Sequence, residues 1–374
     1  MGVKLASSSG GSVEIVSPVT ASNYTATLQP ATGTLLTSNA SGDFTTTNFN
    51  SASTFGFKNR LINGAMMIDQ RNAGASVTVT SSTGYTLDRW STGRSVDSKY
   101  SVQQNAGSVT PPVNFKNYLG VTSLSSYAVT ASDYFFIYQP IEGLNISDLN
   151  WGTANASTVT LSFQVYSSLT GTFGGSLRNS AANRSYPFTY TISSANTWTS
   201  VSVTIPGDTT GTWLTTNGVG IYVQFGLGVG STNSGTAGSW AAASYLSATG
   251  ATSVVGTNGA TFYITGVQLE KGSTATSFDY RPYGTELQLC QRYYYSQAFK
   301  VGNYGTTSSG SRTTVYNKVS MRTTPTYALS GETKSNVGTT FVDVSTTENA
   351  TAYYLASSND MVIYTATMTG TAEL

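Results

Sequence analysis

The chain has 374 residues, of which only 9% are charged, and it contains one cysteine and no histidine. A formal net charge of +1 offers no basic surface to a polyanion, so we discount nucleic acid as a partner. Without histidine, a Ser-His-Asp triad, a Cys-His pair and a His-ligated zinc site are excluded, and we expect neither a metal nor another cofactor.

The remaining composition favours an all-β fold. The chain carries 24 tyrosines, 15 phenylalanines and 38 glycines, and aromatic residues suit pleated sheets while glycine supplies turns. The single cysteine, Cys290, cannot close an intrachain disulfide and is expected to be a small buried residue. No charged and then apolar leader opens the chain, and no apolar run approaches about 18 residues. We therefore expect neither a secretory signal nor membrane insertion, with synthesis in a cytoplasm.

Residues 1–55 are poor in charge and rich in Ser, Thr, Asn and Gly. Val13 and Ile15 alternate with polar residues, as do the apolar residues of 24–28, and Leu35 and Leu36 follow a turn. Strands this short bury little area alone, so we expect an N-terminal docking and oligomerisation segment that pairs with neighbouring chains. A disordered linker is the alternative that this composition also favours.

Residues 56–284 are expected to form one jelly-roll β-sandwich, because short strand patterns alternate with turn residues throughout. The clearest pattern is the alternation of apolar and polar residues over 158–166, which is typical of a half-buried strand. Trp90 and Trp151 are expected to fill the core. The predicted strands cover residues 61–67, 76–80, 87–92, 100–104, 118–122, 135–141, 158–166, 186–193, 199–205, 219–226 and 261–269.

The last of these strands carries apolar residues on both faces. A two-residue period puts Phe262 and Ile264 on one face and Tyr263, Val267 and Leu269 on the other. We therefore expect this strand to be covered on both sides.

A short helical connector is predicted at residues 285–295. Thr285 and Gln288 match a capping box, and apolar residues follow at helical spacing, so the helix should run from about Glu286 to Tyr294. Residues 296–374 then form a small C-terminal β domain, which in a fibre would be the tip. About 80 residues make a small core, so oligomerisation would help it. Its predicted strands are 315–319, 326–329, 340–344, 352–355 and 361–366.

Three stretches carry a family resemblance. Residues 57–71, 85–90 (YTLDRW) and 264–295 (ITGVQLEKGSTATSFDYRPYGTELQLCQRYYY) occur in this order, and together they resemble tail-fibre proteins of tailed bacteriophages, which carry a jelly-roll domain like that of carbohydrate-binding modules. The resemblance implies a virion structural protein, usually trimeric, that attaches to other virion proteins through residues 1–55 and displays its β-domains outward. In many carbohydrate-binding jelly rolls an Asp pair on the closing strand helps to hold calcium. Here Thr265 and Gly266 stand at those positions, so a calcium site is not carried over.

The chemistry left to a chain without histidine is polysaccharide cleavage by two carboxylates roughly 5–9 Å apart. The candidate pairs are Asp133 with Glu142, and Glu142 with Asp148. Isolated acids in a charge-poor β protein more often cap turns or pair with arginine, as Asp279 with Arg281 would. We therefore expect no enzymatic activity.

Sugar binding fits the composition better, because an aromatic platform can hold the apolar face of a sugar while polar side chains orient it. The long loop 228–259 is where binding groups are expected on such a scaffold. The alternative for Trp213 and Trp240 is that they simply pin loops to the sandwich. The candidate platform and rim consist of Asp208, Trp213, Tyr222, Gln224, Asn233, Trp240 and Tyr245.

Three functions remain open. The first is a non-enzymatic tail fibre that binds a host surface polysaccharide or lipopolysaccharide. The second is a capsid-bound head fibre or decoration protein that need not bind a receptor. The third is a tailspike depolymerase that degrades its glycan. In each case the protein would reside in the virion, on the tail or on the capsid surface.

Overall fold

The computed structural model describes residues 3–6, 12–15, 57–80, 84–305, 311–358 and 360–374. The chain divides into two compact units, residues 1–50 and 51–374. In the first unit, β1 (Val3–Ala6) and β2 (Ser12–Ile15) form an antiparallel pair. The predicted patterns at 24–28 and 35–36 lie outside the described residues, and docking by this segment stays a prediction.

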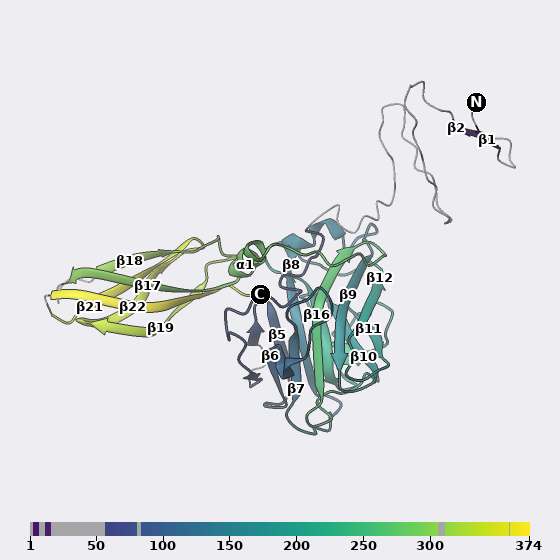
Figure 1. The fold of residues 1–374 in the computed structure, drawn as a ribbon, viewed down its shortest axis with the longest axis horizontal. Helices are drawn as coiled ribbons and strands as arrows, with labels where there is room; N and C mark the ends of the chain where they lie inside the picture. Colours follow the sequence, from purple (N-terminus) through teal and green to yellow (C-terminus); the bar gives the residue numbers. More distant parts are fainter. Residues whose placement is uncertain (1–2, 7–11, 16–56, 81–83, 306–310, 359) are drawn as a thin grey trace. The chain divides into compact units, whose positions relative to one another are not determined.

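The second unit begins with a β-sandwich of two six-stranded sheets (Figure 1). The first, which we name the β8 sheet, has the order β11 (Ser185–Ile192), β10 (Gly171–Arg178), β13 (Val219–Val229), β8 (Tyr134–Glu142), β5 (Trp90–Arg94), β4 (Gly84–Leu87). The second, the β9 sheet, has the order β12 (Thr199–Ile205), β9 (Val159–Ser167), β16 (Thr261–Lys271), β7 (Leu119–Ser123), β6 (Tyr100–Gln104), β3 (Val77–Thr78). All pairings within them are antiparallel, and the chain crosses repeatedly between the sheets, as in a jelly roll. The predicted all-β sandwich is confirmed.

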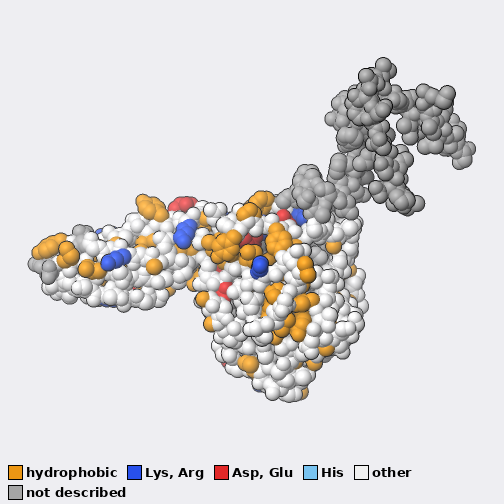
Figure 2. Space-filling view, viewed as in Figure 1, with side chains coloured by type: hydrophobic (Ala, Val, Ile, Leu, Met, Phe, Trp, Pro, Cys, Tyr) orange, Lys and Arg blue, Asp and Glu red, His pale blue; other side chains and the backbone are white. Residues whose placement is uncertain are grey.

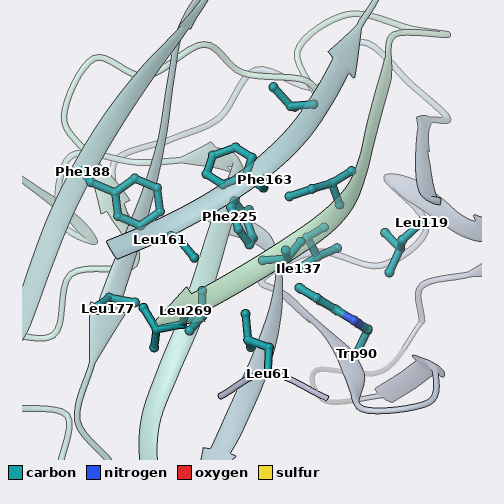
Figure 3. Close-up of a cluster of buried hydrophobic side chains, with 14 of the residues drawn as sticks. Leu61, Trp90, Leu119, Ile137, Leu161, Phe163, Leu177, Phe188, Phe225 and Leu269 are labelled. Atoms are coloured by element: carbon teal, nitrogen blue, oxygen red, sulfur yellow. The ribbon is translucent and has the colours of Figure 1, made fainter. Parts of the chain in front are cut away.

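The core fills the space between the two sheets (Figure 3). On β9 the apolar half of the alternation, including Leu161 and Phe163, is buried as predicted. Phe163 contacts Phe225 of β13 edge to face, with ring centroids 5.1 Å apart. Trp90 and Trp151 also belong to this core.

A β-bulge changes the predicted faces of β16. The register shifts between Thr265 and Gln268, and Gly266 adopts φ +61° there, a conformation that costs glycine little. The extra residue turns Val267 and Leu269 into the same core as Ile264. The two-face assignment of Val267 and Leu269 was therefore wrong, although nearly all of the strand is buried as expected.

The predicted strand at 61–67 is wrong, because this stretch is an irregular loop. Asn63 adopts φ +58°, and its side-chain amide bonds the backbone N–H and C=O of Ile68 and the C=O of Asp88. These side-chain hydrogen bonds take the place of the backbone hydrogen bonds that a paired strand would form. The predicted strand 87–92 is split in two, since Arg89 has φ +68° at the turn between β4 and β5.

Most other predicted strands have counterparts in the two sheets, but β10 was missed. Its sequence, GTFGGSLR, is rich in glycine, which is depleted in strands. The loops contain the short parallel pair β14 (Ser234–Gly235) and β15 (Ser247–Ala248), and the 3-10 turns η1 (Ala106–Ser108), η2 (Gly143–Asn145) and η3 (Ser147–Leu149).

The helix α1 (Tyr283–Gln291) follows the sandwich. It begins earlier than predicted, with Pro282 at the N-cap and no side-chain cap, so the capping box at Thr285 is not formed. Cys290 is buried, as expected.

The remaining residues form two three-stranded antiparallel sheets. One has the order β17 (Tyr294–Gly305), β22 (Asp360–Thr371), β19 (Thr326–Ser335), and the other the order β18 (Ser311–Tyr316), β21 (Asn349–Ala356), β20 (Val337–Ser345). β17 was not predicted as a strand. A small core that includes both Tyr354 and Tyr364 holds these sheets together.

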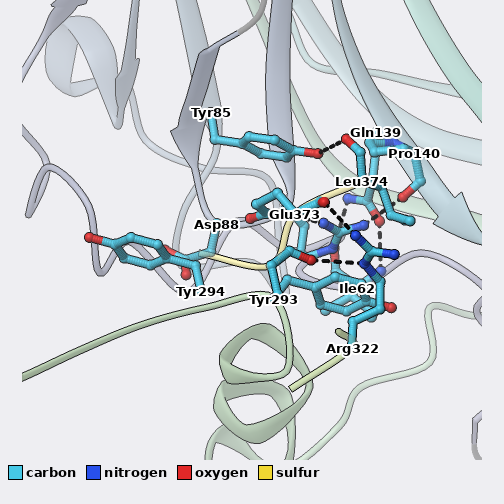
Figure 4. Close-up of polar contacts among 12 residues, drawn as sticks. Ile62, Tyr85, Asp88, Gln139, Pro140, Tyr293, Tyr294, Arg322, Glu373 and Leu374 are labelled. Carbon is cyan, nitrogen blue, oxygen red and sulfur yellow. Dashed lines mark hydrogen bonds and ion pairs between the residues drawn. The ribbon is translucent and has the colours of Figure 1, made fainter. Parts of the chain in front are cut away.

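The residues after β22 return to the sandwich (Figure 4). Glu373 pairs with Arg71 and with Arg89, and Arg322 donates to the backbone oxygens of Ala372 and Glu373 at 2.8 and 2.7 Å. The two ion pairs of Glu373 fasten the end of the chain to the loop at Arg71 and to the turn between β4 and β5.

Candidate functional site

A groove of about 490 Å³ lies on the outer face of the β8 sheet, and we name it the β8 groove. Its volume falls in the range of about 300–1,000 Å³ that is usual for small-molecule sites. It is lined by Tyr134, Phe136, Tyr138, Arg178, Tyr222, Gln224, Asn233, Ser244 and Leu246.

Strand alternation supplies the wall of the groove. On β8, Phe135 and Ile137 are fully buried in the core, so the residues between and beside them face outward. Those outward residues are Tyr134, Phe136 and Tyr138. The sequence YFFIY therefore places alternate side chains in the core and in the groove.

Strand register supplies the floor. Gln224 of β13 lies opposite Tyr138 of β8, and Tyr222 lies opposite Arg178 of β10. The rim comes from the loop between β13 and β16, where the Leu246 N–H donates to the Asn233 carbonyl at 2.8 Å. Three neighbouring strands and one loop thus converge on the groove.

The aromatic residues form a continuous row. Successive ring centroids are 5.9 Å apart from Tyr134 to Phe136, 5.4 Å from Phe136 to Tyr138, and 5.8 Å from Tyr138 to Tyr222. Phe136 lies on the bare backbone of Gly93, where an added Cβ would be 2.3 Å from the ring. The row offers the apolar surface on which the C–H face of a sugar can stack.

The side-chain amide of Gln224, in the floor of the groove, lacks hydrogen-bond partners among the described residues of the protein. Gln224 is fully buried, and neither its amide oxygen nor its amide nitrogen has a hydrogen-bond partner in the part of the chain that the structure describes. An unpaired buried amide costs about 1–3 kcal/mol. Because the amide lines the groove, a ligand with hydroxyl groups could supply both missing partners.

Arg178 is the cation of the groove. Its Nη1 donates to the Ser244 hydroxyl at 2.8 Å, and its guanidinium lies 4.9 Å from the ring centroid of Tyr222. Burial lowers the pKa of Arg178, and burial raises the pKa of Tyr138, whose hydroxyl therefore stays protonated at neutral pH. On the face of the molecule that Figure 2 shows, charged side chains are few and scattered.

The structure divides the predicted site residues into two groups. Tyr222, Gln224 and Asn233 line the β8 groove. Tyr245 lies between the lining residues Ser244 and Leu246, but its ring packs against Gly235.

Trp213, Trp240 and Asp208 lie elsewhere. The two indoles pack with Trp151 at centroid distances of 4.7 and 5.3 Å. Asp208 accepts two hydrogen bonds from Arg184, at 2.8 and 2.6 Å, and one from the Trp213 indole. This cluster pins loops to the sandwich, which is the structural alternative stated above.

Sequence reasoning missed the outward residues of β8 and also Arg178. The period-two spacing of aromatic residues in YFFIY was a usable signal for the first three. No pattern pointed to Arg178, because β10 itself was not predicted.

The first candidate carboxylate pair, Asp133 with Glu142, is too widely spaced to cleave a polysaccharide. Asp133 precedes β8 and Glu142 ends it, so nine strand residues hold them roughly 30 Å apart. Burial alone would raise the pKa of Asp133, but hydrogen bonds from Thr130, Ser95 and Tyr127 outweigh it and lower the pKa.

The other two acids also have structural partners. Glu142 is buried and accepts hydrogen bonds from Arg292, at 3.1 and 2.7 Å, and from the Tyr293 hydroxyl. Asp148 is half-exposed and accepts two hydrogen bonds from Arg60 at 2.8 Å.

A second groove, of about 700 Å³, lies on the outer face of the β9 sheet. Three of its aromatic residues, Phe115, Phe278 and Tyr280, pack mutually with centroids 5.0–5.6 Å apart. Unlike Gln224 in the β8 groove, Gln164 in this groove has a partner. Its amide oxygen accepts a hydrogen bond from the Ser200 hydroxyl at 3.0 Å. No buried unpaired polar atom was found among the side chains that line it and are described.

Neither a metal cluster nor a membrane helix is present in the described ranges. They contain no group of three or more Cys, Asp or Glu residues that could hold a metal. Thr265, which stands where the sequence resemblance raised the question of a calcium site, donates its hydroxyl to the Asn117 carbonyl at 2.7 Å. No described helix is long and apolar enough to span a bilayer.

Comparisons with known proteins gave structural matches only. No family model and no curated protein matches the sequence. A putative sugar-binding protein of Bacteroides thetaiotaomicron matches 57% of this chain and 100% of its own at 13% identity, with a TM-score of 0.33. A family 11 carbohydrate-binding module of Clostridium thermocellum matches 55% and 99% at 10% identity, with a TM-score of 0.26.

The enzymatically active domain of tailspike protein 4 of bacteriophage CBA120 matches 57% of this chain at 12% identity, with a TM-score of 0.31. The chain spans only 22% of that protein. With scores this low, the fold assignment rests on the strand order described above.

Proposed function

We propose that the β8 groove binds a glycan without cleaving it. The observation that carries the proposal is the fully buried, unpaired amide of Gln224 beside the aromatic row. Sugars combine apolar ring faces with hydroxyl groups that both donate and accept, so one ligand would satisfy both features.

We further infer that the chain is a bacteriophage virion protein, with a tail fibre as the first candidate. The three motifs at 57–71, 85–90 and 264–295 support this inference, and the groove would then contact a polysaccharide or lipopolysaccharide of the host surface. Docking through residues 1–55 and assembly as a homotrimer belong to the same proposal. Exposed apolar side chains of the C-terminal sheets, such as Tyr316 and Phe341, are consistent with further contacts between copies.

An array of bacterial surface polysaccharides, probed with the full chain, tests glycan binding. We expect at least one glycan to bind, and Tyr222→Ala or Gln224→Met to weaken that binding by about tenfold or more. Tyr280→Ala, which removes a half-exposed aromatic from the second groove, is the matched control and should bind normally. If Tyr280→Ala weakens glycan binding and Tyr222→Ala does not, the second groove is the binding site.

Two further measurements separate the alternatives. An antibody against the chain should label the tail of purified virions, whereas a label on the capsid would favour the head fibre or decoration protein. Incubation with the bound polysaccharide should leave its chain length unchanged, whereas shortened products would favour a tailspike depolymerase.

A further inference from the structure

We propose that the glycan bound in the β8 groove is anionic and that Arg178 is the counter-ion of its carboxylate or phosphate group. This inference rests on the proposed function of the groove and names the class of glycan. It is carried by the position of Arg178, by its lack of a carboxylate partner, and by the chemistry of the groups around it.

Arg178 differs from the other arginines of the sandwich. In the described residues of 57–284, every other arginine forms an ion pair with a carboxylate. Arg178 forms none with any described residue. Its Nε is buried without a hydrogen-bond partner among these residues, but the same is true of five of the six other arginines, so the missing carboxylate is what sets Arg178 apart. The paired arginines are Arg60, Arg71, Arg89, Arg94, Arg184 and Arg281.

The protein compensates this cation only in part. The Tyr222 ring supplies a cation–π contact and Ser244 accepts one hydrogen bond. Neither contact supplies a carboxylate, and arginine stays protonated at neutral pH. A largely buried cation without a neighbouring anion destabilises the folded protein. The groove therefore favours a ligand that carries a negative charge.

The geometry suits an acidic sugar. A guanidinium presents a planar fork of donors that matches a carboxylate or phosphate with two parallel hydrogen bonds. Arg178 and Tyr222 face each other across β10 and β13, and Gln224 lies two residues further along β13. A pyranose on the aromatic row would thus place its acidic group at Arg178 and its hydroxyls at Gln224.

Matched polysaccharides test the inference. The full chain is titrated with polygalacturonate, polysialic acid and phosphomannan, and with their neutral counterparts: carboxyl-reduced polygalacturonate, carboxyl-reduced polysialic acid and mannan. We expect binding to at least one acidic polymer, roughly 10- to 100-fold weaker binding to its neutral counterpart, and weaker binding at higher salt. Preference for the carboxylate polymers or for phosphomannan identifies the anion.

Variants connect this preference to Arg178. Arg178→Gln should abolish the difference between acidic and neutral polymers, and Arg178→Lys should retain part of it because the charge remains. Lys116→Gln removes the same charge from an exposed position on the chain before β7 and should bind like the natural protein. Near-ultraviolet circular dichroism confirms that each variant is folded.

The outcomes are distinguishable. Equal affinity for an acidic polymer and its neutral counterpart, or unchanged discrimination in a folded Arg178→Gln variant, overturns the anionic ligand and leaves glycan binding standing. Binding to none of these polymers, nor to any polysaccharide of the surface array, overturns the proposed function together with this inference.

Discussion

Arg89 and Glu373 form an ion pair in which the side chains are only 1% and 6% exposed. The pair joins the turn between β4 and β5 to the residues that follow β22, 284 positions later in the chain. Arg89 also lies over the Tyr293 ring, 3.7 Å from its centroid, and donates to the Pro140 carbonyl at 2.7 Å. The contact between the sandwich and the C-terminal sheets therefore depends on a buried charge.

Glu373→Gln should destabilise the protein strongly. It leaves the Arg89 guanidinium buried without its anion, which typically costs about 3–5 kcal/mol of unfolding free energy. Urea unfolding measures the change. The control is Asp148→Asn, which removes a half-exposed partner of Arg60 and should cost at most about 1 kcal/mol. Equal losses in the two variants would contradict a structural role for the buried pair.

Asp88 should make stability fall as pH rises from about 4 to 6. Burial raises the pKa of Asp88 to about 6, against the hydrogen bonds from Gln70 that lower it. The folded state therefore binds the proton more tightly than the unfolded state, and this stabilisation is present below the unfolded pKa and lost as pH passes the folded one. Between the unfolded and the folded pKa, the stabilisation that protonated Asp88 gives the folded state falls by about 3 kcal/mol.

Comparison with Asp88→Asn isolates this effect from the other acids of the chain. Unfolding free energies of both proteins are measured between pH 4 and 7. The natural protein should lose stability relative to the variant across that range. A constant difference between the two proteins would show that Asp88 titrates normally.

Gln224→Met should stabilise the protein by about 1 kcal/mol while weakening glycan binding. The substitution preserves side-chain length and removes an amide that is buried without partners. Gln139→Met is the matched control, because the Gln139 amide is equally buried but bonds the N–H and C=O of Ile62 at 2.9 and 2.8 Å. Gln139→Met should lower the unfolding free energy by about 1–3 kcal/mol. Destabilisation by both substitutions would mean that Gln224 has partners within the fold.

Trp213→Ala should reduce stability and spare binding. The indole packs in the cluster with Trp151 and Trp240, and truncating a buried tryptophan typically costs about 3–5 kcal/mol. Titration with the array-selected glycan, at a temperature where the variant is folded, should give the affinity of the natural protein. A selective loss of affinity would return Trp213 to the binding site.

Cys290 should resist thiol reagents in the native protein. It is fully buried, and burial raises its pKa well above the usual value for a thiol, so neither access nor thiolate is available. Ellman's reagent should react with one thiol per chain in urea and with none before unfolding. Rapid reaction under native conditions would contradict the packing around α1.

The sequence was most informative where a single physical rule decides the structure. Alternation in β9 predicted the strand and its buried face, because period two survives in a regular strand. It failed in β16, where the bulge at Gly266 changes the face of Val267, and at Asn63, whose side chain takes over the bonds of a strand ladder. The bulge is set by the pairing of β16 with β9, and Asn63 also bonds Asp88, 25 residues away, so an alternation of apolar residues reveals neither.

The candidate site shows the same division. Tyr222 and Gln224 were predicted as site residues, but their convergence with Arg178 depends on the register of β10 with β13. Trp213 and Trp240 were chosen by residue type, and only packing shows that they pin loops. Residue type thus suggests the chemistry, whereas register determines which side chains meet.

The most direct test of glycan recognition is a crystal structure of the full chain with an oligosaccharide from the tightest-binding polysaccharide. The account predicts a sugar ring stacked on the aromatic row of the β8 groove, with a hydroxyl group hydrogen-bonded to the Gln224 amide. An oligosaccharide seated on Phe278 and Tyr280 in the second groove, with the β8 groove unchanged, would contradict it.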